Sequence, residues 1–254
     1  RTLCGVPRLY SPSWFLLMLA LAFVAFGLFL LTIFLVAFAW RAPRRHKSMS
    51  LGYCVMHTLC WLLLKCGYSI RVRGLENIPQ EGGVLLIVNH VAYADVVVMG
   101  VMSRRPVRFL SWEGFERHKF IGFMCRLMGT IPVSETKAKE AIVKAGEALA
   151  RGEVVCIFPE GSITRNGGLM QLRKGFELIA RRGGAPIVPV AIDGMWGSIF
   201  SFSGGKSFWK LPKHFPRPIG VVIGKPFPVA EHAKTRSRLL ELAAEAFAMR
   251  KSLE

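Results

Sequence analysis

The longest apolar stretch of the chain runs from Ser13 to Trp40 and contains no charged residue and no proline. About 20 helical residues span the hydrocarbon core of a bilayer, so this stretch is long enough to cross one with some tilt. Trp14 and Trp40 lie near its ends, where aromatic rings favour the membrane interface. The pattern predicts a transmembrane helix at about 13–40 within an N-terminal anchor and basic linker, residues 1–47.

Two other interpretations of this stretch are a cleaved secretory signal and a hairpin that enters and leaves the membrane on one side. The stretch is about twice as long as the apolar region of a signal, and no small-residue cleavage site follows it. No turn signal lies near its centre, where a hairpin would bend. A single-pass anchor is therefore the expected arrangement.

Basic residues flank the stretch unequally. Arg41, Arg44, Arg45 and Lys47 follow it, whereas Arg1 and Arg8 precede it. By the positive-inside rule, the remainder of the chain is expected on the cytoplasmic face of a membrane, such as a bacterial inner membrane. The same basic cluster would attract anionic head groups.

Residues 48–68 are also apolar, but this segment is shorter and is interrupted by His57 and Lys65. It predicts a helix that either lies in the membrane interface or packs on the domain that follows.

From residue 69 to 254, short apolar or alternating runs take turns with segments of helical periodicity. Strands are predicted at 69–74, 82–90, 107–112, 130–134, 153–161, 186–194 and 219–227, and helices at 94–103, 118–129, 136–152, 167–184 and 236–251. This order predicts an α/β domain whose mixed, largely parallel sheet is flanked by helices. The connection 195–218 is long, aromatic and basic, and it either contacts the membrane or covers the active site.

Composition narrows the class of partner. The 254-residue chain is 52% hydrophobic and has a formal net charge of +18, which implies nucleic acid, an anionic lipid surface or a phosphorylated substrate. The apolar composition favours lipid, and the basic residues are spread out without a recognition motif, so no nucleic acid is expected. The six cysteines lack zinc-ligand spacing; we interpret them as small buried residues in a reducing compartment and expect no metal site.

A polar break interrupts the apolar stretch "LLIVNHVAYADVVVMG" and contains His90 and Asp95. The predicted strand places His90 at its carboxyl end, where sites in α/β sheets tend to lie. A turn before the next helix can fold Asp95 back onto the imidazole and fix its tautomer, so that the other ring nitrogen takes a proton from a hydroxyl. The alternative is that His90 caps the turn and Asp95 caps the helix.

The stretch "FPEGSITRNGGLMQLRKG" also follows a predicted buried strand. Glu160 and Gly161 begin its polar turn, and Arg165, Arg173 and Lys174 lie downstream. Glycine lets a backbone approach a ligand closely, and an arginine fork suits phosphate oxygens. The stretch has no P-loop motif. The alternative is a glycine-rich surface turn with solvated charges.

Together these stretches resemble the motifs of the glycerophospholipid acyltransferase family, the lysophosphatidate acyltransferase superfamily. The family's first block, N-H-x4-D, is matched by "NHVAYAD", and its third, F-P-E-G-[ST], by "FPEGS". The second block is matched by "GTIPVSE" from Gly129, with Glu135 where arginine is usual, and "APIVPVAI" with Pro189 resembles the fourth. In the third block Ile163 takes the place of a frequent arginine, and Arg165 follows two residues later.

The resemblance implies that His90 is a general base on a lipid hydroxyl and that Asp95 orients and supports it. The substrate-binding residues that it implies are Glu160, Gly161, Ser162, Arg165, Gly129 and Pro189. The activated oxygen would attack the thioester of acyl-CoA or acyl-ACP directly, with no acyl-enzyme. No metal or redox cofactor would be required.

The expected acceptor is a lysophospholipid of the lysophosphatidate or lysophosphatidylethanolamine type, in phospholipid synthesis or remodelling. The expected partners are acyl-CoA or acyl carrier protein and an anionic membrane surface. The stretch "FPEGSITRNGGLM" is most similar in appearance to 2-acyl-glycerophosphoethanolamine acyltransferase domains, often fused to transporter or acyl-ACP synthetase modules, and a chain beginning at Arg1 would suit excision from such a fusion. The alternative is a non-catalytic membrane lipid-binding module coupled to a fused transporter.

Overall fold

The computed structural model describes residues 12–41, 49–211, 214–228 and 231–253. The chain divides into two compact units, Arg1–Pro43 and Arg44–Glu254. The basic residues behind the expected orientation lie mostly outside the described residues: Arg1, Arg8, Arg44, Arg45 and Lys47.

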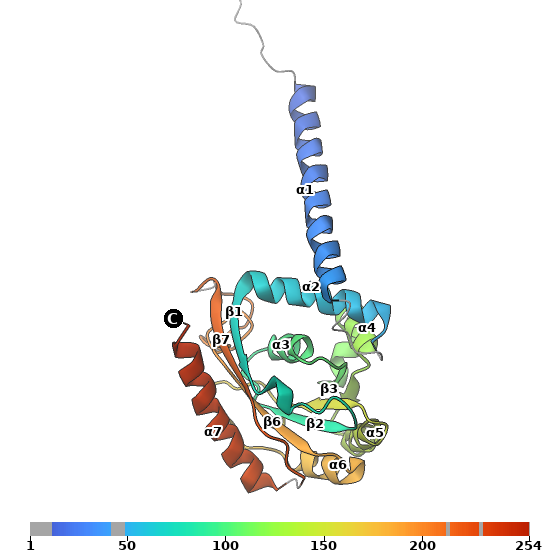
Figure 1. Cartoon of the computed structure of the whole chain (residues 1–254), viewed down its shortest axis with the longest axis vertical. Coiled ribbons are helices and arrows are strands. Elements are labelled where there is room, and N and C mark those ends of the chain that lie inside the picture. The colour runs from blue at the N-terminus through green and yellow to red at the C-terminus, as the bar shows by residue number, and fades with distance from the viewer. Residues whose placement is uncertain (1–11, 42–48, 212–213, 229–230, 254) are drawn as a thin grey trace, which may run out of the picture. The chain divides into compact units, whose positions relative to one another are not determined.

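The described part of the first unit is one continuous helix, α1 (Pro12–Arg41), as the apolar stretch predicts (Figure 1). Within the described ranges, its segment Phe15–Trp40 is the one helix long and apolar enough to cross a membrane.

The second unit alternates strands and helices. Its elements are α2 (Leu51–Gly67), β1 (Tyr68–Arg73), β2 (Val84–Val88), α3 (Asp95–Met102), β3 (Val107–Trp112), α4 (Lys119–Met128), β4 (Ile131–Val133), α5 (Ala138–Ala150), β5 (Val154–Ile157), α6 (Gly175–Gly183), β6 (Ile187–Asp193), β7 (Arg217–Ile223) and α7 (His232–Lys251). Short 3-10 turns at Leu75–Asn77 and Glu113–Arg117 complete the described elements.

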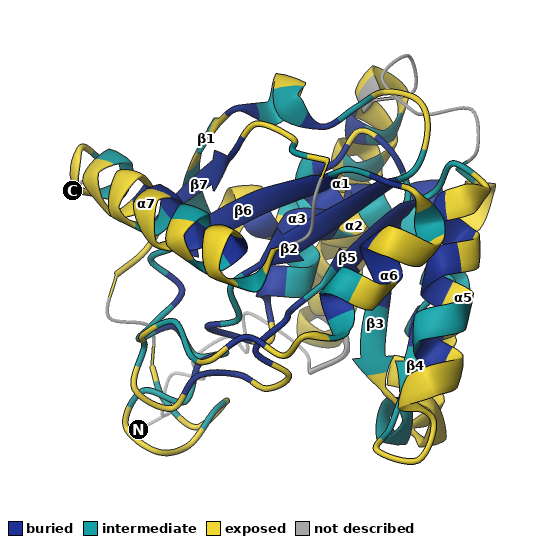
Figure 2. Cartoon of the chain, turned by 90° about the horizontal axis from the view of Figure 1, so that it is seen from below, coloured by how far each residue is buried: buried dark blue, intermediate teal, exposed yellow. Residues whose placement is uncertain are grey.

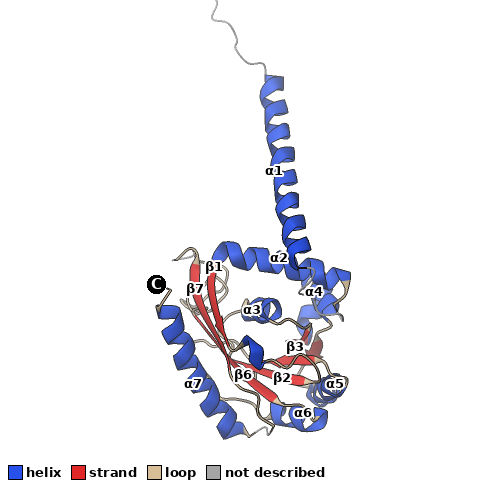
Figure 3. Ribbon diagram, in the orientation of Figure 1, coloured by secondary structure: helices blue, strands red, loops and turns tan. Residues whose placement is uncertain are grey.

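These strands form one seven-stranded sheet in the order β1-β7-β6-β2-β5-β3-β4 (Figure 2). Figure 3 shows the strands in red between the helices. Strands β6, β2, β5, β3 and β4 run parallel to one another. Strand β7 is antiparallel to β6, and β1 is parallel to β7. The predicted mixed, largely parallel sheet with flanking helices is confirmed.

The centre of the sheet is buried on both faces (Figure 2). In β2, Val84, Leu86 and Val88 belong to one core cluster with residues of α3. The intervening Leu85 and Ile87 belong to a second cluster with residues of α5 and α6. Because successive strand residues point to opposite faces, burial on both faces requires the continuous apolar run that the sequence shows.

Helix α2 packs one face on the domain. Its cap is Ser50, whose hydroxyl accepts the Tyr53 N–H at 3.2 Å. Leu64 joins the core cluster that contains α3. The opposite face leaves Leu59 and Leu63 exposed, so an additional contact with the membrane interface stays open.

The helix predicted at 167–184 is only half present, because α6 begins at Gly175. The preceding residues are irregular, since their backbone N–H groups have acceptors elsewhere. Met170 donates to the Glu160 carboxylate at 2.7 Å, and Arg173 donates to the Pro159 carbonyl at 2.7 Å. These non-local bonds replace the helical ladder and hold the segment against the turn after β5.

Candidate active site

The candidate site lies at the carboxyl ends of β2, β5 and β6. Asn89 follows β2, and its side-chain amide bonds both backbone groups of Ile192 in β6. Its nitrogen donates to the Ile192 carbonyl at 2.9 Å, and its oxygen accepts the Ile192 N–H at 2.8 Å. These two hydrogen bonds anchor the turn that begins with His90. Sequence reasoning gave Asn89 no role, although its place between the strand and the histidine was a usable signal.

His90 and Asp95 are in contact. Nδ1 of His90 lies 3.1 Å from Oδ2 of Asp95, whose side chain is fully buried. The same oxygen accepts the N–H groups of Val91 at 2.6 Å and Ala92 at 2.8 Å. Backbone donors therefore hold the carboxylate in place, independently of the imidazole.

This contact determines what the imidazole can do. An ionised carboxylate only accepts hydrogen bonds, so Nδ1 of His90 is the donor and Nε2 is left as the acceptor. The His90 side chain is 15% exposed. Its ring stacks on Phe158, with centroids 4.0 Å apart and planes 19° apart. The ring is thus held in a fixed plane while one part of it stays accessible, as a general base requires.

Glu160 joins the two polar stretches. The residue is 5% exposed, and its two carboxylate oxygens accept the N–H of His90 at 2.6 Å and of Met170 at 2.7 Å. The His90 carbonyl accepts the Thr164 N–H at 3.0 Å. Burial raises the pKa of Glu160, and the hydrogen bonds from Met170 and His90 oppose that rise. Glu160 therefore fixes the backbone on which the histidine is mounted.

The turn after Glu160 requires a glycine. Gly161 has φ +74°, and a Cβ there would lie 2.5 Å from Nε of Arg173. The Arg173 side chain therefore covers this turn directly. Ser162 and Arg165 are exposed beside it, and the Arg165 guanidinium lies 3.6 Å from the ring centroid of Phe202. The second polar stretch thus brings two guanidinium groups to the border of the site.

Cys156 lies in β5 next to this constellation and is fully buried. Burial raises the pKa of its thiol, and the Asp95 carboxylate adds to the rise. A protonated buried thiol is a poor nucleophile. This favours direct attack by a substrate hydroxyl over a cysteine acyl-enzyme.

The comparisons with known proteins agree with this geometry. A family model described as Acyltransferase matches residues 69–193, which include both polar stretches. The 1-acyl-sn-glycerol-3-phosphate acyltransferase of Bacillus subtilis is 29% identical over 189 residues, covering 72% of this chain and 88% of that protein. The enzyme of the same name from Borreliella burgdorferi is 31% identical over 142 residues, covering 55% of this chain and 55% of that protein. Residues 69–193 therefore form an acyltransferase domain of the glycerophospholipid acyltransferase type.

Two further members show the range of this acyltransferase family. The lyso-ornithine lipid O-acyltransferase of Pseudomonas aeruginosa is 27% identical over 54% of this chain and 53% of its own length. The crystal structure of the 1-acyl-sn-glycerophosphate (LPA) acyltransferase PlsC from Thermotoga maritima has a TM-score of 0.55 and 17% identity, covering 84% of this chain and 94% of that one. At that identity the likeness establishes the fold.

Two of the predicted site residues of this acyltransferase are not brought to the histidine. Gly129 ends α4 with φ +61°, two residues before β4, and strands β5 and β3 separate β4 from β2. Pro189 lies inside β6, paired with Ile87, and its carbonyl accepts the Gly224 N–H at 2.8 Å. The contact of either residue with substrate stays a prediction.

The two departures from the acyltransferase family pattern have different surroundings. Ile163 is 8% exposed, so its side chain is directed into the interior. Glu135 is exposed in the turn between β4 and α5. In the described ranges no three His, Cys, Asp or Glu side chains gather as a metal site requires. The absence of a metal or redox cofactor stays a prediction.

Proposed function

We propose that the protein is a membrane-bound O-acyltransferase that moves a fatty acyl chain from a thioester to the free glycerol hydroxyl of a lysophospholipid. The observation that supports this most is the His90–Asp95 pair, because it orients an imidazole base at the carboxyl edge of the sheet in an acyltransferase domain of this type. Acyl-CoA and acyl-ACP are the two candidate donors.

The reaction follows from the position of the imidazole. Nε2 of His90 takes the proton of the acceptor hydroxyl as the oxygen attacks the thioester carbonyl. The C–S bond then breaks, and the departing thiolate takes a proton from the imidazolium, so the enzyme returns to its starting form. Asp95 stabilises the imidazolium through Nδ1. A positioned general base contributes about 10²–10⁴-fold in rate, and the remainder comes from holding both lipids in place.

The acceptor head group is expected beside the turn at Gly161. Arg165 and Arg173 are exposed there, and a guanidinium fork suits phosphate oxygens. Ser162 adds a hydroxyl. Glu160 is buried behind the turn and shapes it. These contacts favour a phosphate-bearing acceptor of the lysophosphatidate or lysophosphatidylethanolamine type.

The relatives do not all share one acceptor. Two are named for 1-acyl-sn-glycerol-3-phosphate and one for a lyso-ornithine lipid. Similarity to these relatives alone therefore leaves the head group open, and the two exposed arginines are the reason to prefer a phosphate.

The membrane location rests on α1 and on the substrates. Acceptor and product both reside in a bilayer, so a helix of this length and apolarity would keep the site at its surface. The cytoplasmic face, where acyl-CoA and acyl-ACP occur, is the expected side. Fusion to a transporter or synthetase module stays a prediction.

The test is acyl transfer by the purified full chain in mixed micelles. Each acceptor of a panel (lysophosphatidate, lysophosphatidylethanolamine, a lyso-ornithine lipid and monoacylglycerol) is offered with acyl-CoA and, separately, with acyl-ACP. Transfer to a phosphate-bearing lysolipid supports the proposal. Binding of lysolipids without turnover on any pair would instead support the non-catalytic lipid-binding module.

A further inference from the structure

The connection between β6 and β7 is long, from Gly194 to Pro216, yet its start is firmly held. The Arg217 guanidinium donates to the carbonyls of Gly194 and Trp196. Connections of this length without regular structure are usually functional or disordered. Residues 199–211, called the flap below, make enough contacts to be ordered. We therefore expect this connection to be functional.

The flap contacts the turn between His90 and Asp95. Ala92 forms an isolated antiparallel bridge with Ser201, and the Tyr93 N–H donates to the Phe200 carbonyl at 3.1 Å. The Tyr93 ring contacts the rings of Phe202 and Phe208, at centroid distances of 5.8 and 5.5 Å. Backbone and side chains of the flap are therefore joined to the residues that position the base.

The flap also contacts the second polar stretch, because Arg165 lies over the ring of Phe202. It is closed on itself by Lys210, whose ammonium donates to the carbonyls of Ser201 at 2.8 Å and Ser203 at 2.6 Å. The Phe208 N–H donates to the Ile199 carbonyl at 2.7 Å. An ordered flap of this kind keeps its tip at a fixed place relative to His90.

Lys206, Trp209 and Leu211, called the tip of the flap below, face solvent. Trp209 is 86% exposed and Leu211 is 88% exposed. Exposing two large apolar side chains to water is unfavourable for a globular domain. Lys206, three residues before Trp209 in the chain, is also exposed. An aromatic ring, an aliphatic side chain and a cation together suit the interface of an anionic bilayer.

We propose that the tip of the flap enters the interface of an anionic lipid bilayer and thereby holds the His90–Asp95 turn at the surface from which the acceptor arrives. The proposal rests on the proposed function, because the His90–Asp95 turn needs to lie at a bilayer only if the acceptor is a lipid. A protein partner is a weaker occupant, since two side chains and a lysine offer far less area than the roughly 800 Å² per partner of a stable interface. Of the two interpretations of this connection, both then hold: its base borders the active site, and its tip contacts the membrane.

The first experiment locates Trp209. The full chain and its Trp209→Phe variant are reconstituted in phosphatidylcholine–phosphatidylglycerol vesicles, with and without brominated acyl chains. The fluorescence difference between the two proteins, which is the emission of Trp209, is expected to fall about twofold in brominated vesicles because an interfacial indole is within reach of the bromines. Trp196→Phe is the matched control, since Trp196 lies against Gly167 at the base of the connection. A Trp209 emission that brominated lipid does not change would overturn the proposal.

The second experiment separates docking from chemistry. Trp209→Ser/Leu211→Ser is assayed with a long-chain lysolipid in vesicles and with a short-chain, monomeric lysolipid. We expect turnover in vesicles to fall about tenfold, because two apolar side chains no longer leave water. Turnover of the monomeric acceptor is expected to stay within about twofold of the wild type, a difference of less than half a kcal/mol. Leu240→Ser/Phe247→Ser on α7 is the control, since these apolar side chains are also exposed.

The outcomes are distinct. Equal losses on both acceptors would overturn the docking role, because the flap would then act only on the structure of the site. Unchanged turnover in vesicles would overturn it as well. If the wild type transfers no acyl group to either acceptor, the proposed function fails, whereas the quenching of Trp209 still decides whether the tip meets lipid.

Discussion

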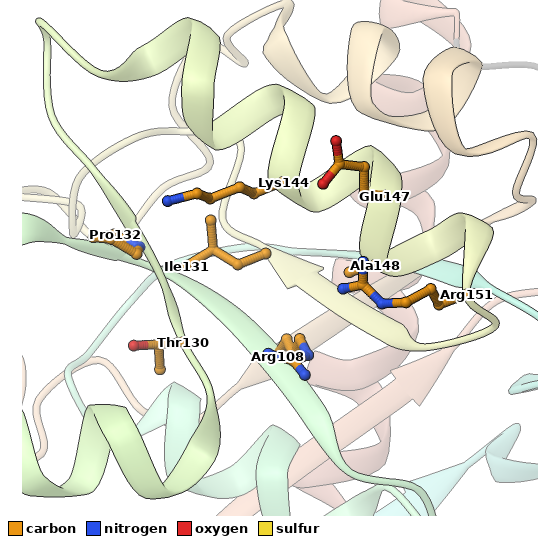
Figure 4. A pocket seen from close by; sticks show the side chains of 8 residues that line it. All are labelled: Arg108, Thr130, Ile131, Pro132, Lys144, Glu147, Ala148 and Arg151. Atoms are coloured by element: carbon orange, nitrogen blue, oxygen red, sulfur yellow. The ribbon is translucent and has the colours of Figure 1, made fainter.

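Two charged regions of the domain are built in opposite ways. At the carboxyl edge of the sheet, Asp95 and Glu160 are 0% and 5% exposed, and backbone N–H groups of the turns donate hydrogen bonds to both carboxylates. Nearer the amino ends of the strands, a pocket of about 200 Å³ lies between α5 and the strands β3 and β4 (Figure 4). It is lined by Arg108, Thr130, Ile131, Pro132, Lys144, Glu147, Ala148 and Arg151.

The arginines that line the pocket form ion pairs with another long charged side chain. Arg108 and Arg151 both pair with Glu153, which is 28% exposed, while Arg108 is 39% and Arg151 is 56% exposed. Exposed pairs of this kind are weak and are screened by salt. Burying a carboxylate is costly unless several donors compensate. Backbone donors compensate the buried carboxylates of Asp95 and Glu160. We therefore expect charge to matter for function at the carboxyl edge and not in the pocket.

The largest effect is expected from the pair itself. His90→Ala removes the base and should lower kcat by about 10²–10⁴-fold. Asp95→Asn keeps an oxygen for the Val91 and Ala92 N–H groups but cannot support an imidazolium, so a loss of similar order is expected. Acyl transfer by the purified variants checks this, with circular dichroism as the control for folding. Full activity in both variants would end the assignment.

The next effect is expected at Glu160, because its carboxylate satisfies one N–H with each oxygen. Glu160→Gln has one oxygen and an amide nitrogen that cannot accept, so either His90 or Met170 loses its partner. An unsatisfied buried donor costs about 1–3 kcal/mol, and the backbone of His90 should be held less firmly. We expect a lower thermal midpoint together with a drop in kcat of about tenfold, the kinetic equivalent of 1.4 kcal/mol. A variant with normal stability and normal kcat would show that this bridge is dispensable.

Local patterns explain how much of this was visible in the sequence. The apolar run of β2 and the periodicity of α5 depend on neighbours within each element, so both were predicted correctly. The contact of His90 with Asp95 was predictable for the same reason, since five positions and one turn separate them.

The missed features depend on residues far apart in the chain. Glu160 lies 70 positions from His90, and Asn89 lies 103 positions from Ile192. The helix predicted at 167–184 is absent over 167–174, because the Glu160 carboxylate accepts the Met170 N–H that a helix would have used. No local periodicity reports such a competition, because it depends on which loops the sheet brings together.

A smaller effect is expected from the exposed guanidinium at the border of the site. Arg173→Ala should raise KM for a phosphate-bearing lysolipid about tenfold, because a charged hydrogen bond is worth about 1.5–3 kcal/mol, and should leave kcat nearly unchanged. Relative to the wild type, monoacylglycerol should show no such change, since it has no phosphate. Arg181→Ala, an exposed arginine in the last turn of α6, is the matched control. Equal rises in KM for both acceptors would argue for a structural role of Arg173.

The smallest effect is expected in the pocket of Figure 4, and it tests the contrast most directly. Lys144→Gln/Arg151→Gln removes two exposed cations that pair with Glu140 and Glu153. Exposed pairs of this kind contribute little to stability, so the thermal midpoint should move little, and less in high salt than in low salt. Acyl transfer should stay within about twofold of the wild type, which corresponds to a difference of about 0.4 kcal/mol in activation free energy. A loss as large as that of Arg173→Ala, confined to one thioester donor, would mean instead that the pocket binds part of that donor, and the two regions would then serve one reaction.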